Sequence, residues 1–280
     1  MATTVRKTDR EDGDRYPGAV DVADVNYETS TALYGRSGSG KTTLAATWPK
    51  PILYLNIKDN GTDSISDVEG VDVVHINSGE ELKDLILWCA RKASKGKLKY
   101  RTVILDTMTQ LQSLLTVEKG VNSKLKKSTG KKRPGDYGTL TRQDWGEIAG
   151  DLKAVIMDIR NLPMHSVFIA QERVFNAGDE EDDGADQLVP EVGTRLMPSV
   201  NSDLCASVTI VGNCFVRLRI EKVKDPETKK TTRQAHKDFC LRVGPNEVYT
   251  TKIRKPKGIK APDYITDPTF KKIKAIMKGN

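Results

Sequence analysis

One glycine-rich octapeptide constrains the fold of this chain more than any other feature. It reads Gly35-Arg36-Ser37-Gly38-Ser39-Gly40-Lys41-Thr42. An apolar run of strand type, Thr31 to Tyr34, comes directly before it, and we expect a helix to open at its end. Glycines allow such a loop to curl until several backbone N–H groups point inward, and a following helix adds its positive amino-terminal end. The octapeptide therefore predicts a nest for phosphate between a strand and a helix.

This strand, loop and helix pattern is the P-loop, or Walker A, motif. We expect all eight residues and Thr43 to bind a nucleoside triphosphate, with the backbone around the β-phosphate and Thr43 near the α-phosphate. Lys41 would reach the β- and γ-phosphates, and the Thr42 hydroxyl would hold Mg²⁺. The predicted ligands are therefore ATP and Mg²⁺. The alternative is a glycine-rich turn that only resembles the motif.

A second segment supports this prediction. The run Val103-Ile104-Leu105-Asp106 has the form of a hydrophobic strand that ends in a carboxylate, as a Walker B strand does. We expect Asp106 to bind the magnesium ion directly or through water. Many buried strands end in aspartate, so this pattern depends on the upstream P-loop for its meaning.

Short, nearly continuous apolar runs alternate with helical patterns over the first two thirds of the chain. The runs are typical of parallel strands that are buried on both faces. They are Thr31–Tyr34, Ile52–Ile57, Val71–Ile76, Thr102–Leu105 and Ser166–Ala170. One helix is expected to start at Ser78, with Glu81 completing a capping box, and another to run from about Leu140 to Asn161 with Trp145 on its apolar stripe. This alternation predicts an α/β fold with a largely parallel sheet.

The pattern changes after Asp203, where strands follow one another without helices between them. We expect these strands to extend the sheet in antiparallel fashion. They are Val208–Val211, Phe215–Val223, Ala235–Val243 and Val248–Ile253, with a turn at Asp225–Lys230. A short amphipathic helix is expected near Phe270 to Met277. The predicted organisation is a flexible polar arm over 1–27, a core over 28–262 and a basic tail over 263–280.

Composition excludes a membrane protein and a disulfide framework. The formal net charge is +7, 30 % of the residues are charged, and no apolar run approaches the ~18 residues of a membrane helix. No signal-peptide pattern opens the sequence, so we expect a soluble, cytoplasmic protein. The four cysteines show no CxxC pair and are expected to be buried, reduced thiols.

A third motif makes the chain resemble the RecA-like ATPases, especially their phage-encoded single-strand-annealing branch. It is Ser166-Val167-Phe168-Ile169-Ala170-Gln171, similar to the family's strand that ends in a glutamine. The resemblance covers roughly Thr29 to Pro262. It implies a RecA-like P-loop NTPase core with a mostly parallel central sheet flanked by helices. It also implies that Gln171 senses the γ-phosphate during catalysis, although a glutamine at a strand end could equally cap a backbone group.

Two loops of a RecA-like core hold DNA, and by position they would be Lys119 to Thr139 and Phe175 to about Pro198. The first contains a basic cluster and an aromatic ring that could stack on a base. The predicted DNA-binding residues are Lys124, Lys126, Lys127, Lys131, Lys132, Arg133 and Tyr137. The alternative is a solvated basic loop. The second loop is acidic over 178–186, which departs from a simple DNA-contact loop, although Arg173 and Arg195 could contact phosphate.

The second strand departs from the family, which carries a water-activating glutamate there. The sequence Tyr54-Leu55-Asn56-Ile57-Lys58-Asp59 offers no glutamate. Either Asp59 acts as the catalytic base, or hydrolysis is slow and ATP acts mainly as a conformational ligand.

The segment after Thr251 is similar to one with which some RecA-like subunits reach the phosphates of a neighbour. The predicted residues of this contact in trans are Arg254, Lys255 and Lys257. Cations supplied in this way would couple hydrolysis to assembly. The alternative is a basic tail that adds general DNA affinity.

The leading hypothesis is a DNA-dependent ATPase that oligomerises on single-stranded DNA, as a ring or a filament, and promotes annealing or strand pairing in phage recombination. A single-strand-binding protein is a further expected partner, and the host cytoplasm is the expected location. The rival hypothesis is a nucleotide-switched loader or scaffold with little ATPase activity. A small-molecule kinase is disfavoured because the long loops lack an arginine-rich lid.

Overall fold

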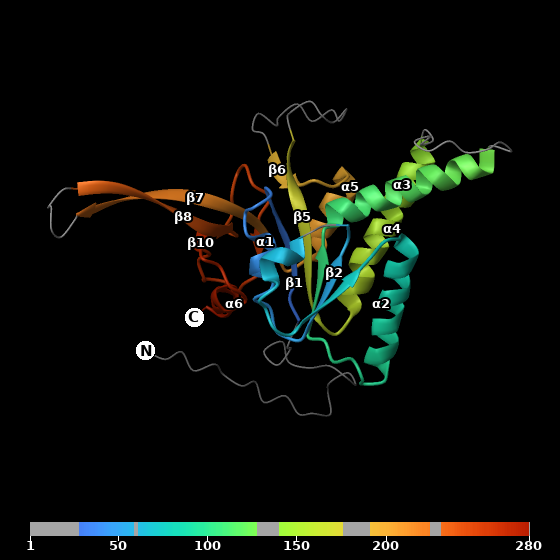
Figure 1. The fold of residues 1–280 in the computed structure, drawn as a ribbon, viewed down its shortest axis with the longest axis horizontal. Helices are drawn as coiled ribbons and strands as arrows, with labels where there is room; N and C mark the ends of the chain where they lie inside the picture. The colour runs from blue at the N-terminus through green and yellow to red at the C-terminus, as the bar shows by residue number, and fades with distance from the viewer. Residues whose placement is uncertain (1–27, 59–60, 128–139, 176–190, 225–230, 280) are drawn as a thin grey trace.

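The computed structural model describes residues 28–58, 61–127, 140–175, 191–224 and 231–279 (Figure 1). The predicted amino-terminal arm, the acidic segment 178–186 and the turn Asp225–Lys230 lie outside these residues.

Six parallel strands form the centre of one mixed sheet. In spatial order they are β7 (Ile210–Lys224), β1 (Ser30–Gly35), β5 (His165–Phe175), β4 (Thr102–Asp106), β2 (Ile52–Asn56) and β3 (Val71–His75). Four strands pair in antiparallel fashion around them: β8 (Thr231–Arg242) on β7, β10 (Tyr264–Thr266) on β8, β9 (Lys252–Ile253) on β7 and β6 (Glu191–Thr194) on β5. The predicted α/β class with a parallel centre and an antiparallel carboxy-terminal extension is confirmed.

Helices cover both faces of this sheet (Figure 1). One face carries α2 (Gly79–Ser94), α3 (Met108–Lys127), α4 (Arg142–Asn161) and α5 (Pro198–Ser207), and the other carries α1 (Lys41–Ala45), the 3₁₀ turn η2 (Gly61–Ile65) and α6 (Phe270–Lys278). Each face of the sheet has its own hydrophobic core, and side chains of β1 alternate between them. Ala32 and Tyr34 pack into the core on the α2 side, and Leu33 packs into the core on the α1 side. No helix among the described residues is long and apolar enough to span a membrane.

The helix starts follow the predicted capping chemistry with two corrections. The Ser78 hydroxyl accepts from the Glu81 N–H at 3.1 Å, but the Glu81 carboxylate accepts from the Asn77 N–H, so the predicted box is not closed on Ser78. Helix α4 begins after Thr141, which forms a true capping box with Asp144. Trp145 is 42 % exposed and does not join the buried stripe of α4.

Four further expectations are wrong in detail. The first loop for which DNA contact is predicted begins inside α3, and the second contains β6. Helix α5 was not predicted. The predicted strands Val208–Val211 and Phe215–Val223 form the single strand β7, because tertiary contacts fill the polar break: a side chain at Gly212 would meet Leu241, and Asn213 accepts from Arg242 at 2.8 Å. The predicted strand Val248–Ile253 is divided: Tyr249 forms an isolated bridge with Val192, and β9 pairs with β7.

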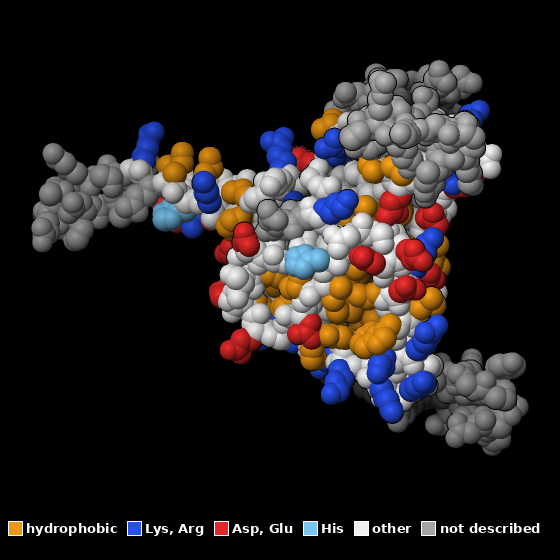
Figure 2. Space-filling model, turned by 45° about the vertical axis from the view of Figure 1, so that its right-hand side comes forward, with side chains coloured by type: hydrophobic (Ala, Val, Ile, Leu, Met, Phe, Trp, Pro, Cys, Tyr) orange, Lys and Arg blue, Asp and Glu red, His pale blue; other side chains and the backbone are white. Residues whose placement is uncertain are grey.

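Beyond Phe215, where β10 no longer pairs with β8, strands β7 and β8 leave the body as a two-stranded ribbon (Figure 1). Val216, Leu218 and Ile220 alternate on one face, with Phe239 opposite Val216, and Leu218 and Ile220 are 65 % and 66 % exposed. Figure 2 shows hydrophobic side chains along this projection. The other face carries ion pairs such as Arg217–Asp238 at 2.9 Å. The ribbon is therefore amphipathic.

Candidate functional site

The carboxyl ends of β1, β4 and β5 lie at one end of the sheet, and a cavity of about 390 Å³ opens there. Its volume falls within the ~300–1,000 Å³ of small-molecule sites. Its lining comes from the P-loop (Ser37, Gly38, Gly40, Lys41, Thr42, Thr43), from η2 (Gly61, Asp63, Ser64) and from the strands or their ends (Asp106, Thr107, Gln171, Phe239). The structure therefore brings both Walker segments and Gln171 to one place, although β5 continues to Phe175 and does not end at the glutamine as predicted.

The loop conformation requires glycine at two positions. Gly38 and Gly40 have φ of 75° and 80°, which other residues adopt only with strain. The Ser39 hydroxyl donates to the Arg36 carbonyl at 2.8 Å, and the Lys41 ammonium donates to the carbonyls of Gly35 and Arg36 at 3.0 and 2.7 Å. Since α1 has only five residues, loop N–H groups and Lys41 supply most of the positive potential.

Three predicted nucleotide-binding residues support the loop from outside the cavity lining. Gly35 ends β1, Ser39 is buried and bonded to Arg36, and Arg36 points outward. The Arg36 guanidinium pairs with the Glu172 carboxylate at 2.8 Å, but the arginine side chain is 87 % exposed. A pair this exposed contributes little to stability.

Oxygen ligands converge beside Asp106, which is buried. The Thr42 hydroxyl donates to its Oδ2 at 2.8 Å, and the Tyr54 hydroxyl donates to the same oxygen. A Cβ at Gly61 would lie 3.4 Å from Asp106 Oδ2 and 3.5 Å from both hydroxyl oxygens, so the missing side chain keeps this space open. A carboxylate and a hydroxyl are the hard oxygen ligands that Mg²⁺ prefers. The residues present therefore fit the predicted metal.

Gln171 connects the cavity to the segment that follows β6. Its backbone N–H donates to the Thr109 hydroxyl at 3.1 Å, and its side-chain carbonyl accepts from the Arg195 guanidinium at 3.3 Å. The Arg195 N–H also donates to the Gln171 carbonyl at 2.7 Å. The side-chain oxygen of Gln171 thus binds a cation from the second predicted loop, rather than capping a backbone group.

Tyr54, which contacts Asp106, was not identified from the sequence, and neither were five residues of the cavity lining: Gly61, Asp63, Ser64, Thr107 and Phe239. Tyr54 looked like one more apolar position in β2, Asp63 lay in an unassigned segment, and Phe239 lay in a distant strand. Parallel pairing of β2 with β4 brings Tyr54 beside Asp106, and no local pattern indicates such a pairing. Asp63 could have been identified from the sequence, because it is a carboxylate that follows the second strand closely.

Other predicted residues lie elsewhere or outside the description. Asp59, Lys131, Lys132, Arg133 and Tyr137 are not among the described residues. Lys124, Lys126 and Lys127 belong to the last turns of α3, not to a loop as predicted, and their side chains lie outside the description. Arg254 is exposed, and its guanidinium donates to the Ala206 carbonyl at 3.3 Å, while Lys255 and Lys257 follow it in the chain. These three residues do not line the cavity.

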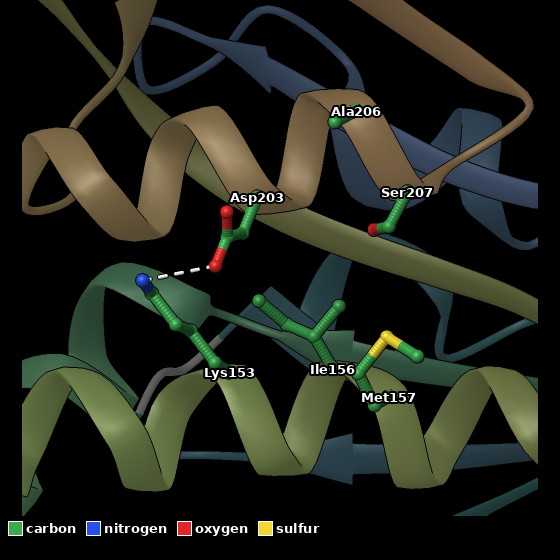
Figure 3. A pocket seen from close by; sticks show the side chains of 6 residues that line it. All are labelled: Lys153, Ile156, Met157, Asp203, Ala206 and Ser207. Atoms are coloured by element: carbon green, nitrogen blue, oxygen red, sulfur yellow. Dashed lines mark ion pairs between the residues drawn. The ribbon is translucent and has the colours of Figure 1, made fainter.

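A second cavity, of about 320 Å³, lies between α4 and α5 (Figure 3). Lys153 and Asp203 close one side of it with an ion pair of 2.9 Å, and Ile156 and Met157 form its apolar floor. Because Lys153 and Asp203 neutralise each other, we interpret this cavity as a groove between two packed helices.

The cysteines are free thiols, as predicted. Three are buried and Cys205 is half-buried. Burial raises the pKa of Cys89 to about 11 and that of Cys214 to about 12, so these thiols stay protonated at neutral pH.

Comparison with known families finds one match, to the model described as AAA domain, over residues 28–254. This span begins two residues before β1 and ends just after β9, so it includes the whole cavity. A search of curated proteins finds no match.

Proposed function

The chain belongs to the AAA domain family, and from this premise of a nucleotide-binding P-loop ATPase we propose that it binds single-stranded DNA and promotes annealing or strand pairing in phage recombination. The observation that carries the nucleotide site is the contact of Thr42 with Asp106 inside the P-loop cavity. The RecA-like resemblance and the basic cluster at 124–133 support the DNA-binding part.

We assign each polar group of the cavity a part in binding and turnover. Thr42 and Asp106 would hold Mg²⁺, which when bound neutralises charge on the phosphate oxygens. Lys41 would exchange the loop carbonyls of Gly35 and Arg36 for phosphate oxygens. The loop N–H groups would hold the β-phosphate, and Thr43 would lie near the α-phosphate. A carboxylate of the segment after β2, Asp59 or Asp63, would take the proton of the attacking water.

The link between the cavity and DNA would pass through Gln171. Its side chain lines the cavity and binds Arg195, in the second loop for which DNA contact was predicted. A γ-phosphate that recruits the Gln171 amide would release or reorient Arg195. ATP would thereby change the DNA-binding surface, which is the coupling that an ATP-dependent annealing protein requires.

The nucleotide site is tested with Lys41→Ala. Because the ammonium is expected to bind the β- and γ-phosphates, this variant should lose ATP binding or turnover while it keeps its thermal unfolding midpoint. Lys95→Ala, which removes an exposed lysine after α2, is the matched control. Retained ATP affinity together with unchanged turnover in Lys41→Ala would overturn the assignment.

DNA binding is tested with the combined variant in which Lys126, Lys127, Lys131 and Lys132 become Ala. The control changes Lys92, Lys95, Lys97 and Lys99, which removes the same charge near the end of α2. If four phosphate contacts are lost, the slope of log K against log salt should become shallower by about 3, at about 0.7 per contact on single strands. Equal slopes in the two variants would exclude the 124–133 cluster from the interface.

One observation favours the alternative function, a nucleotide-switched loader or scaffold. Within the described residues, no glutamate lines the cavity, and the carboxylates there are Asp63 and Asp106. Phosphate release measured with and without single-stranded DNA separates the two proposals. Strong stimulation by DNA supports the annealing ATPase, and a flat, low rate supports the switch.

A further inference from the structure

Phe239 stands at the rim of the cavity on a strand that sequence reasoning never connected with the P-loop. It precedes Leu241 by two residues in β8, so both side chains point to the sheet face on which α1 lies. Its ring atom Cδ1 lies 3.0 Å from the place where a Cβ of Gly40 would stand. Although it lines the cavity, the side chain is 43 % exposed.

The strand order gives the cavity two chemically different ends. Asp106 and Gln171 come from β4 and β5, on one side of the P-loop strand β1. Phe239 comes from β8, which lies on the other side of β1, beyond β7. A triphosphate whose terminal phosphate faces Asp106 and Gln171 therefore directs the rest of its molecule towards Phe239.

At that end of the cavity, Phe239 offers a flat, partly exposed aromatic face. A planar nucleobase is the part of a nucleoside triphosphate that such a face accepts, because stacking buries two apolar surfaces without leaving polar groups unpaired. Stacking of this kind does not depend on the identity of the base. We propose that Phe239 is the nucleobase-contacting residue of this site, an assignment that rests on the proposed binding of ATP at the P-loop.

The experiment compares ATP with inorganic tripolyphosphate, which lacks the nucleoside, by isothermal titration calorimetry in the presence of Mg²⁺. Phe239→Ala should bind ATP about tenfold more weakly and tripolyphosphate within twofold of the parent chain. Phe239→Tyr should keep its ATP affinity, because the ring remains. GTP and CTP should follow ATP in all variants.

Val216→Ala is the matched control, since Val216 lies directly opposite Phe239 on the same ribbon face but does not line the cavity. It should change neither affinity. Phe239→Leu repeats the test without the ring but with most of its volume, in case Phe239→Ala does not fold.

Two results would overturn the assignment. Equal weakening of both ligands would show that Phe239 only supports the phosphate loop through Gly40, and unchanged ATP affinity in both Phe239→Ala and Phe239→Leu would show that the ring makes no contact. A parent chain that binds neither ATP nor tripolyphosphate would instead refute the proposed function itself.

Discussion

At the scale of single residues, hydrogen bonds from two other side chains orient the Asp106 carboxylate. Asp106 accepts hydrogen bonds from Thr42 and Tyr54 on the same oxygen, and both donors sit on separate elements, α1 and β2. The two hydrogen bonds orient this carboxylate towards the cavity. Tyr54 therefore acts on the predicted metal site through Asp106, as outer-shell partners of metal ligands do.

Tyr54→Phe removes this hydroxyl and leaves the buried ring. We expect the apparent affinity for Mg²⁺, measured by titrating Mg²⁺ into protein with a fluorescent ATP analogue, to fall about tenfold. Nucleotide affinity without Mg²⁺ should stay the same.

Tyr100→Phe is the control, because the Tyr100 hydroxyl donates to the Asp72 carboxylate at 2.7 Å, away from the cavity. If Tyr54→Phe and Tyr100→Phe show the same Mg²⁺ dependence as the parent chain, Tyr54 has no role in positioning Asp106.

At the scale of elements, strand β5 enters the sheet through a buried histidine. The Nδ1 atom of His165 accepts from the Thr29 N–H at 2.8 Å, and the ring packs edge-on against Phe270 of α6 at 5.2 Å between centroids. Burial lowers the pKa of His165 below its ordinary value of 6.5. Protonation would remove the acceptor of the Thr29 N–H, although the Thr29 carbonyl would still accept from the Ser166 N–H.

This arrangement predicts a pH-dependent stability. Since the unfolded chain binds the proton at higher pH than the folded chain, the contribution of His165 is complete above pH 6.5 and is lost as the pH falls below it. Urea unfolding of the parent chain and of His165→Asn, measured from pH 7.5 to 5.0, should show a shallower decline in the variant. His75→Asn, which changes an exposed histidine on β3, should keep the parent slope. If the free energy of unfolding of His165→Asn declined with pH as steeply as that of the parent chain, His165 would not be the source of the pH dependence.

Elements with a strong local pattern were predictable, and elements set by distant contacts were not. The buried strands and helices α2, α4 and α6 follow their periodicity. Strand β6 and the segment near Thr250 instead pair through the backbone of Val192, and the Tyr34 hydroxyl lies against both, within 3.0 Å of the carbonyls of Val192 and Thr250. No window of sequence contains both partners of such a bond.

At the scale of the whole molecule, the position of Arg254 decides whether it can contact the phosphate site of its own chain. Strand β9 pairs with the start of β7, which runs parallel to β1, so Arg254 lies at the end of the sheet where β1 begins. The P-loop follows the other end of this six-residue strand, about 20 Å away. Arg254 therefore cannot reach its own cavity, and a phosphate contact would require a second copy.

A mixing experiment tests this contact in trans. Arg254→Ala should lower ATP turnover at least tenfold with less than twofold change in ATP affinity, because the lost charge would act only on the transition state. Mixing it with Lys41→Ala should restore part of the turnover, since mixed assemblies pair an intact P-loop with an intact Arg254.

The control is Lys271→Ala, which removes an exposed charge from α6. A mixture of Arg254→Ala and Lys41→Ala that is no more active than the two variants apart would remove Arg254 from the catalytic interface.

The sequence by itself determined the α/β class, the P-loop and the carboxylate that faces it, because each depends on residues close together in the chain: glycines that permit positive φ, apolar runs, and a strand end. Only the tertiary structure decided that Asp63 and Phe239 line that cavity, that Tyr54 contacts its carboxylate, and that Arg254 lies at the other end of the sheet. Their positions follow from strand order and pairing, which depend on packing between segments up to two hundred residues apart.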